Sequence, residues 1–289
     1  MELQGLHHIT MITGDARKNV DFYANMLGLR LVKKTVNFDS PDAYHLYFGD
    51  EVGTPGTILT WFEFAGARRG RAGAGMIHTI QLGVASEEAL EFWKERLDIS
   101  DARFTDYDGL RYELHVSGAE PHRAIHPEIP EEFAITGIVG ARAYGAQGEH
   151  PVLTDTLGFT ADGDDFTLNG FRWGYDAPPA ERGLLGAGTV HHIAWASRDE
   201  DHLAWQRRVY EAGLSVSDVR DRDYFRSIYF GEPRGILFEI ATLSPGFAVD
   251  EDPAHLGEQL RLPSQHEHLR PQLEKLLTPI VNPRTELVR

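Results

Sequence analysis

The sequence predicts an α+β protein made of four βαβββ units, and a stretch repeated near both ends of the chain is the main reason. LHHITMITGD occupies residues 6–15, and VHHIAWASRD occupies residues 190–199. Each has an aliphatic residue, a His pair, a short apolar run, and an Asp seven residues after the second His. Fainter copies begin near residues 75 and 134. A unit of this kind cannot bury its sheet face alone, so the units must pair with one another.

The first unit, residues 1–65, shows the order strand, helix and three strands. Residues 15–29 have helical spacing, with Asp15 as the expected N-cap and Gly28 as the expected stop. Strand-like segments follow at 29–38, 43–50 and 56–64, separated by turns rich in Pro and Gly.

The fourth unit, residues 188–243, repeats this order. A helix-like segment at 199–212 is followed by the strand-like segments RSIYFGE and RGILFEIA. Alignment of the two units places Tyr47 opposite Tyr229, and Thr60 opposite Glu239.

The middle of the chain contains two weaker copies. The second unit, residues 75–130, has His78 and Thr79 where the His pair stood and a helical stripe ending at Leu97. It offers no glutamate in a matching place. The third unit, residues 133–178, is degenerate, so both are expected to be structural and free of metal. Residues 244–289 form a tail with a short expected helix.

Composition limits the kinds of function. The net charge of −16 argues against nucleic-acid binding, because phosphate backbones require a basic surface. No apolar run is long enough to span a membrane, and the N-terminus lacks signal-peptide features, so a cytoplasmic location is expected. With no Cys in the chain, a metal site must be built from His, Asp and Glu.

The units opening with HHIT and closing with GILFEI resemble the vicinal oxygen chelate superfamily, which includes glyoxalase I, fosfomycin-resistance proteins and extradiol dioxygenases. The resemblance implies that the units pair into two cupped, mixed β-sheet domains. With metal half-sites expected in the first and fourth units, the chain is most similar to ring-cleaving dioxygenases of the hydroquinone type. The tail, LRLPSQHEHLRPQLEKLLTPI, is also similar to that group.

The resemblance assigns the metal ligands to His8, His192 and Glu239. Their chemistry agrees, because two imidazoles and one carboxylate form a facial triad that leaves positions open for substrate and O2. An unpaired carboxylate in the apolar strand ILFEIA would be costly, which favours a metal there, with an Arg partner as the alternative.

Other site residues follow from the same resemblance. It places His7 and His191 near the substrate or behind the ligands, although strand alternation points them away from the metal. A plain hydrogen bond in the core is the alternative for both. Thr10 shares a face with His8 and is expected to line the cavity. His191, Arg222 and Tyr229 are expected to act in catalysis: Arg222 would stabilise negative charge, and Tyr229 or His191 would exchange protons. The alternative for Arg222 is a solvated turn, and the alternative for Tyr229 is a repeated sheet aromatic. His45 and Arg226 are further pocket candidates.

The implied activity is an Fe(II)-dependent, extradiol-type cleavage of a hydroquinone-like or related dihydroxylated ring by O2. Mn(II) is a second metal option, no organic cofactor is expected, and a homo-oligomer is left open. Glyoxalase I uses a carboxylate in both paired units, whereas Thr60 stands at one of these places here. A glyoxalase-like isomerase or lyase, and a non-catalytic protein that binds small aromatics, are the alternatives.

Overall fold

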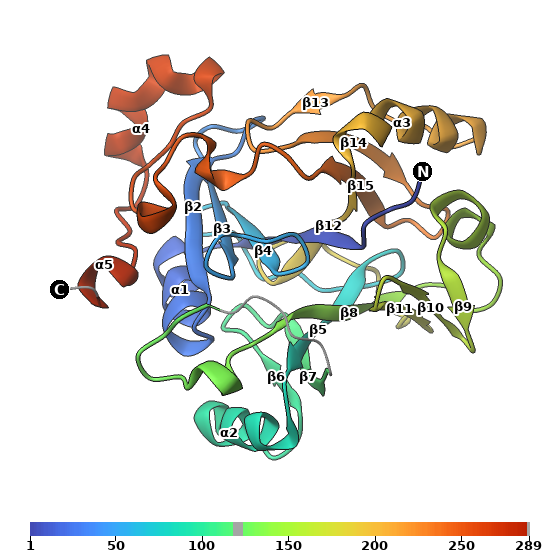
Figure 1. Ribbon diagram of the computed structural model, residues 1–289, viewed down its shortest axis with the longest axis horizontal. Helices are drawn as coiled ribbons and strands as arrows, with labels where there is room; N and C mark the ends of the chain where they lie inside the picture. The colour runs from blue at the N-terminus through green and yellow to red at the C-terminus, as the bar shows by residue number, and fades with distance from the viewer. Residues whose placement is uncertain (118–123, 288–289) are drawn as a thin grey trace.

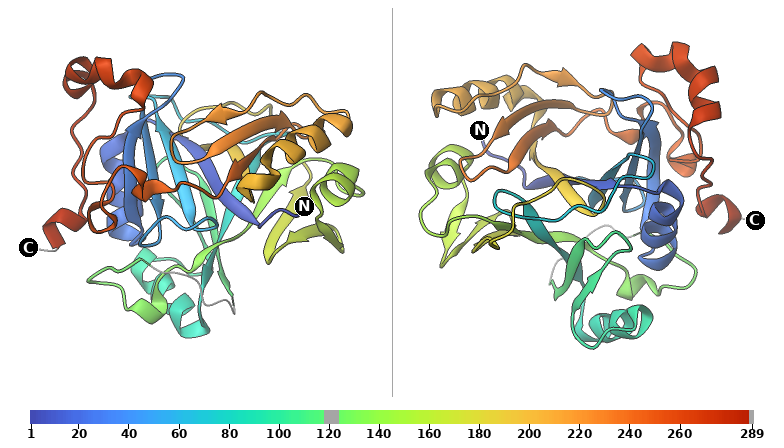
Figure 2. Two further views of the ribbon diagram at one scale, coloured as in Figure 1. Left: turned by 45° about the horizontal axis from the view of Figure 1, so that its top comes forward. Right: turned by 180° about the vertical axis from the view of Figure 1, so that it is seen from behind.

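The computed structural model describes residues 1–117 and 124–287, and it confirms the α+β fold of two curled, mixed β-sheets (Figures 1 and 2). The eight-stranded sheet combines the first and fourth units, and the seven-stranded sheet combines the second and third. Residues 118–123, inside the predicted second unit, lie outside the described residues, as do the last two.

The eight-stranded sheet joins the two ends of the chain through its central strands. β1 pairs antiparallel with β12, and each of these strands pairs in parallel with the last strand of its own unit. The strand order is β13-β14-β15-β12-β1-β4-β3-β2. The bounds are β1 Leu6–Thr13, β2 Arg30–Val36, β3 Tyr44–Gly49, β4 Ile58–Glu63, β12 Thr189–Ser197, β13 Arg220–Asp221, β14 Arg226–Gly231 and β15 Leu237–Thr242.

The seven-stranded sheet repeats this plan with one strand fewer. Its order is β6-β7-β5-β8-β11-β10-β9. In the described chain the second unit has two strands after its helix, not the predicted three. Residues 98–102 alone connect that helix to β6, which is too short for a turn and another strand. The third unit is complete despite its degenerate sequence. The bounds are β5 Ile77–Val84, β6 Arg103–Thr105, β7 Arg111–Val116, β8 Gly137–Tyr144, β9 Thr160–Asp162, β10 Asp165–Leu168 and β11 Phe171–Asp176.

A helical segment follows the first strand of every unit. α1 (Ala16–Val20) begins at Asp15, whose carboxylate accepts hydrogen bonds from two backbone N–H groups, as predicted for an N-cap. No helix in the described parts of the chain is long and apolar enough to cross a membrane. The other bounds are α2 Glu87–Leu97, α3 His202–Glu211, and π-helical turns at Asp21–Met26 and Val152–Leu157.

The two sheets pack against each other through large aromatic side chains. The Trp195 ring on β12 lies 6.1 Å from Trp173 and 5.4 Å from Phe171, both on β11. Side chains alternate along a strand, so His192 and Ala194 lie on the opposite, concave face of the first sheet. The concave face of the first sheet is therefore free to hold a site.

The C-terminal tail, residues 244–287, covers one flank of the first sheet (Figure 2). Lys33 on β2 is fully buried and forms ion pairs with Asp250, at 2.6 Å, and with Glu251. Phe247 packs 5.0 Å from the ring of Tyr47 on β3. The tail ends in α4 (Arg270–Leu276) and α5 (Arg284–Leu287).

The buried ion pair should make Lys33 important for stability. The side chain of Glu251 is only 2% exposed. In Lys33→Met its nearest cation would be Arg261, whose Nε lies 3.8 Å from Glu251 Oε1. Breaking a buried pair costs about 3 kcal/mol or more, so we expect a loss of that size in the free energy of unfolding, measured by urea denaturation.

Lys94→Met is the matched control, since Lys94 pairs with Glu91 on the surface of α2. Its expected loss is below about 1 kcal/mol. Equal stability of the two variants would contradict a structural role for the Lys33 pair.

Candidate metal centre

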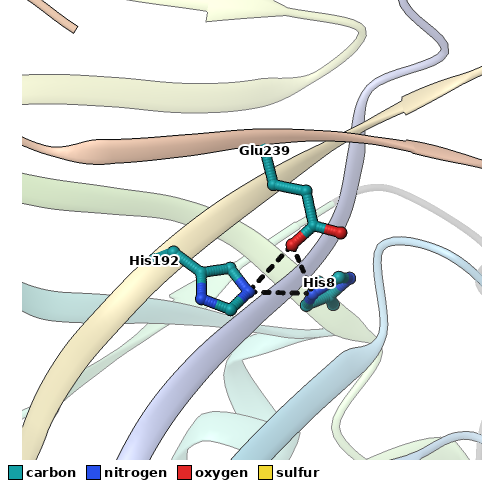
Figure 3. A group of neighbouring side chains, drawn as sticks. All are labelled: His8, His192 and Glu239. Atoms are coloured by element: carbon teal, nitrogen blue, oxygen red, sulfur yellow. Dashed lines mark hydrogen bonds and ion pairs between the residues drawn. The ribbon is translucent and has the colours of Figure 1, made fainter. Parts of the chain in front are cut away.

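Three ligand-type side chains meet on the concave face of the first sheet. His8 on β1 and His192 on β12 are 184 positions apart in the sequence, and their Nε2 atoms lie 3.3 Å apart. Glu239 lies on β15, the parallel neighbour of β12. Its Oε2 lies 2.9 Å from His192 Nε2 and 3.5 Å from His8 Nε2. The three side chains converge from three strands, as Figure 3 shows.

The spacing of these donor atoms fits a divalent metal. Donors on one face of an octahedron lie about 3 Å apart when the metal–ligand bonds are about 2.1 Å long. Within residues 1–117 and 124–287, these three side chains form the one group of His, Asp and Glu able to hold an ion, with ligand atoms within 4.8 Å of one another.

Glu239 is fully buried. Burial alone would raise the pKa of its carboxyl, but the adjacent imidazoles of His8 and His192 outweigh this effect and hold the pKa well below its ordinary value. Ser227 donates a hydrogen bond to the other carboxylate oxygen, Oε1. Burial lowers the pKa of His192, so this imidazole is neutral and keeps a lone pair for a metal. Glu239 and His192 therefore have the protonation that metal binding requires of them.

His7 and His191 contact the ligands, whereas regular strand alternation predicted that they would point away. Both fall at irregularities of the β1–β12 pairing, where the register shifts. Nδ1 of His7 lies 2.8 Å from Nδ1 of His8. Nδ1 of His191 likewise lies 2.8 Å from Nδ1 of His192. Burial lowers the pKa of His7 to about 3 and that of His191 to about 4, so both rings are neutral. Each contact orients a ligand so that Nε2 faces the metal position.

Thr60 lies at the place where the fourth unit has Glu239. Tyr47 pairs with Thr60 on β3 and β4, and Tyr229 pairs with Glu239 on β14 and β15, which is the alignment predicted from the sequence. Thr60 Oγ1 lies 3.0 Å from Thr10 Oγ1 and 2.8 Å from His45 Nε2. The first unit therefore contributes one imidazole and a neutral hydroxyl group, where the fourth contributes an imidazole and a carboxylate.

Arg222 and Tyr229 lie together on the fourth-unit side of the triad. Arg222 Nε donates to the Tyr229 hydroxyl at 3.3 Å, and its Nη2 lies 3.2 Å from Asp39 of the first unit. The ring of Tyr229 lies 5.8 Å from that of His192. Burial raises the pKa of the Tyr229 hydroxyl, which therefore stays protonated. A cation and a proton donor thus stand next to the metal position.

These groups surround a small cavity of about 30 Å³. A cavity that accommodates benzene measures about 150 Å³, so this one has room for about two water molecules. The lining residues are His8, Asn37, Phe38, Asp39, His45, Tyr47, Phe62, His192, Arg222, Phe225, Tyr229 and Glu239.

The predicted pocket residues differ in how they relate to this cavity. His45 lines it. Thr10 does not, because its hydroxyl group is fully buried against Thr60. His7 and His191 lie behind the ligands, outside the lining. Arg226 is also outside, on the exposed surface, with Nη2 3.9 Å from Asp199.

The sequence did not assign several of the lining residues, Phe62 among them, to the site. Phe225, whose ring lies 5.3 Å from that of His8, and the loop at 37–39 carry no repeated motif. Tyr47 had a signal, its register with Tyr229, but that match also suited an ordinary sheet aromatic.

A larger hollow, of about 1000 Å³, lies in the second sheet and extends over its edge strand β6. His78 contacts Asp176 there, with 2.9 Å between Nε2 and Oδ2.

The expectation that the second unit has no glutamate in a matching place is wrong, because Glu113 lies at that place. It pairs with Gln81 as Thr60 pairs with Thr10. Arg103 Nε lies 3.2 Å from Glu113 Oε1 and balances the charge of this carboxylate. The larger volume of this hollow therefore does not make it a better candidate for the metal centre.

Several known proteins are similar to this chain over almost its whole length. Relatives of nearly the same length include two Bacillus subtilis proteins named as ring-cleaving dioxygenases. MhqO is 43% identical to this chain, over 95% of this chain and 96% of its own length. MhqA is 38% identical, over 97% of this chain and 100% of its own length. The chlorohydroquinone/hydroquinone 1,2-dioxygenase of Sphingobium indicum is 33% identical over 96% and 98%.

Solved structures show the same fold. A crystal structure named for a dioxygenase of Bacillus subtilis superposes with a TM-score of 0.90, at 42% identity over 96% of this chain and 98% of that one. Glyoxalase I from Zea mays superposes with a TM-score of 0.56 at 12% identity, over 82% and 92%, and so shares the fold alone. The family model of the glyoxalase/bleomycin resistance protein/dioxygenase superfamily matches residues 5–114 and 87–240, and the chain belongs to that superfamily.

Proposed function

We propose that this protein is a metal-dependent dioxygenase that cleaves a hydroquinone-like ring with O2. The observation that carries the proposal is the three-donor face of His8, His192 and Glu239, with the neutral Thr60 at the place of a second carboxylate. A three-ligand site of this type leaves adjacent positions for a substrate oxygen and O2. The relative from Sphingobium indicum, named for hydroquinone and chlorohydroquinone, supports this substrate class.

Fe(II) is the metal we propose, and the same donors also suit Mn(II). When bound, it would supply the one-electron chemistry that O2 needs to react with an aromatic ring. His7 and His191 would hold the two ligand rings in position through the Nδ1 contacts. No organic cofactor is needed for this chemistry.

Arg222 and Tyr229 are the groups we assign to charge and proton handling. The guanidinium of Arg222 lies on the cavity wall and would stabilise negative charge on substrate oxygens as the ring opens next to a hydroxyl-bearing carbon. Tyr229, protonated and hydrogen-bonded to Arg222, would donate a proton to that developing anion.

Entry of a ring requires the cavity to widen, because about 30 Å³ is too small for it. We propose that this widening separates the contacts that join the loop at 37–39, which lines the cavity, to the fourth unit and the tail. Arg222 reaches Asp39 at 3.2 Å, and His266 Nε2 lies 2.8 Å from the carbonyl of Phe38. Asp39 is 71% exposed, so little burial opposes its movement.

Two other functions known for this fold predict different behaviour. A glyoxalase-like isomerase or lyase would use the metal only to polarise a carbonyl and would consume no O2. A protein that only binds small aromatics has no need for the buried, charged Glu239 and its two imidazoles.

Metal content tests the ligand assignment. His8→Ala, His192→Ala and Glu239→Ala each remove one of three donors, so the metal bound per chain should fall about tenfold or more. Elemental analysis of anaerobically purified protein measures this loss, with circular dichroism to confirm folding.

His78→Ala is the matched control. This histidine stands at the place of His7 in the second unit and contacts Asp176 instead of a metal ligand. Metal content should not change. Full occupancy in folded Glu239→Ala protein would refute the assignment.

Oxygen uptake tests the reaction. Fe(II)-loaded protein given hydroquinone should consume one O2 per ring and form a ring-opened acid that absorbs in the near ultraviolet. Arg222→Met and Tyr229→Phe should each lower kcat by about 100-fold while metal content stays constant, because neither residue is a ligand.

Arg226→Met controls for the loss of a cation on the same hairpin, since Arg226 does not line the cavity. It should keep its activity. No O2 uptake across substituted hydroquinones and catechols, with iron bound, would exclude the dioxygenase function and leave the metal site standing.

A further inference from the structure

A chain of hydrogen bonds leads from the centre of the first sheet into the cavity. Thr10 Oγ1 lies 3.0 Å from Thr60 Oγ1, which lies 2.8 Å from Nε2 of His45. Nδ1 of His45 lies 2.9 Å from the hydroxyl of Tyr47. His45 and Tyr47 line the cavity, and Thr10 does not. The chain therefore begins in the sheet and ends at Tyr47, a residue of the cavity wall.

This chain occupies the half of the site that lacks a carboxylate. In the fourth unit Ser227 donates to Glu239. The strand register places His45 where Ser227 stands, because His45 pairs with Phe62 as Ser227 pairs with Ala241. His45 and Tyr47 are thus residues of the first unit that line the same cavity as the triad.

The two groups of the chain that line the cavity, His45 and Tyr47, are neutral. Burial lowers the pKa of His45 well below its ordinary value, and burial raises the pKa of Tyr47 well above its own. His45 then has one N–H and one acceptor nitrogen. If His45 accepts from Tyr47, a lone pair of the phenol oxygen faces the cavity. If His45 donates, the Tyr47 O–H is free to point there.

A hydroquinone-like substrate needs such a partner. Two hydroxyls on adjacent ring carbons can both bind one metal, whereas hydroxyls on opposite carbons cannot. The hydroxyl that is not on the metal must then meet the cavity wall, and a buried hydroxyl without a partner is costly. The other polar groups on the wall have different roles or bonds: Arg222 and Tyr229 are proposed above to handle the charge and the proton of the ring-opening step. Arg222 bonds to Tyr229 and Asp39, and Asn37 Oδ1 accepts from the backbone N–H groups of Asp39 and Ser40.

We propose that the Tyr47 hydroxyl binds the substrate hydroxyl that is remote from the metal, and that Tyr47 thereby selects rings with two separated hydroxyls. His45 and Thr60 are positioning residues, since they hold the Tyr47 hydroxyl through the chain. This inference rests on the proposed function, because it takes the substrate to be a dihydroxylated ring bound at the triad.

Binding calorimetry on Fe(II)-loaded protein without O2 tests the proposal. The probes are hydroquinone and 4-methylphenol, in which a methyl group replaces the remote hydroxyl. Wild-type protein should bind hydroquinone more tightly. Tyr47→Phe should weaken hydroquinone binding about three- to tenfold, the effect of one neutral hydrogen bond, and leave 4-methylphenol binding unchanged.

The His45 variants test the positioning role. Asn can place an acceptor near the position of Nδ1, so His45→Asn should retain part of the preference for hydroquinone, whereas His45→Phe should lose it. Tyr224→Phe is the matched control. Its ring lies 6.2 Å from that of Tyr47, but its hydroxyl bonds to Asp250 and is not on the cavity wall, so the preference should persist.

Two results would overturn the inference in different ways. Equal hydroquinone affinity in wild-type and Tyr47→Phe proteins, with ring cleavage intact, would refute the role of Tyr47 alone. If wild-type, metal-loaded protein binds neither probe, the inference falls together with the proposed substrate.

Discussion

The antiparallel pairing of β1 with β12 is the constraint on which the site depends. It joins two segments 184 positions apart in the sequence. The Nε2 atoms of His8 and His192, on these two neighbouring strands, therefore lie 3.3 Å apart. The register shifts in this pairing also place His7 and His191 against the two ligands. A shift of one residue in this pairing would turn the ligands toward the aromatic core between the sheets, so packing and chemistry depend on the same register.

The second sheet shows what the same geometry becomes without the ligands. β5 pairs with β8 much as β1 pairs with β12, but Thr79 and Gly140 occupy the positions of His8 and His192. Arg142 forms a two-point ion pair with Asp176, and Arg103 neutralises Glu113. Pairs of opposite charge thus satisfy the acidic groups of this sheet directly, with no need for an ion.

Sequence alone was sufficient for the repeat, the pairing of the end units and the convergence of the triad, because each depends on a duplicated context. Sequence alone was insufficient where the backbone departs from regular strand geometry. The alternation rule misplaced His7 and His191, since a bulge leaves no mark in a His pair. Three further features depend on loop lengths and on packing between distant segments: the strand that the second unit lacks among its described residues, the position of Thr10 and the exposure of Arg226. Periodicity carries no information about these.

The difference between Thr60 and Glu239 sets the charge of the proposed centre. A divalent metal held by two neutral imidazoles and one carboxylate has a net charge of about +1, so one anionic substrate oxygen can bind and leave the site neutral. A second carboxylate at position 60 would already cancel the metal charge, and in a buried site that would disfavour an anionic ligand. Arg222 adds a cation on the side of Glu239, and the neutral Tyr47–His45–Thr60 chain adds none on the other. Negative charge is therefore best stabilised near Arg222, whereas the opposite wall suits a hydroxyl that keeps its proton.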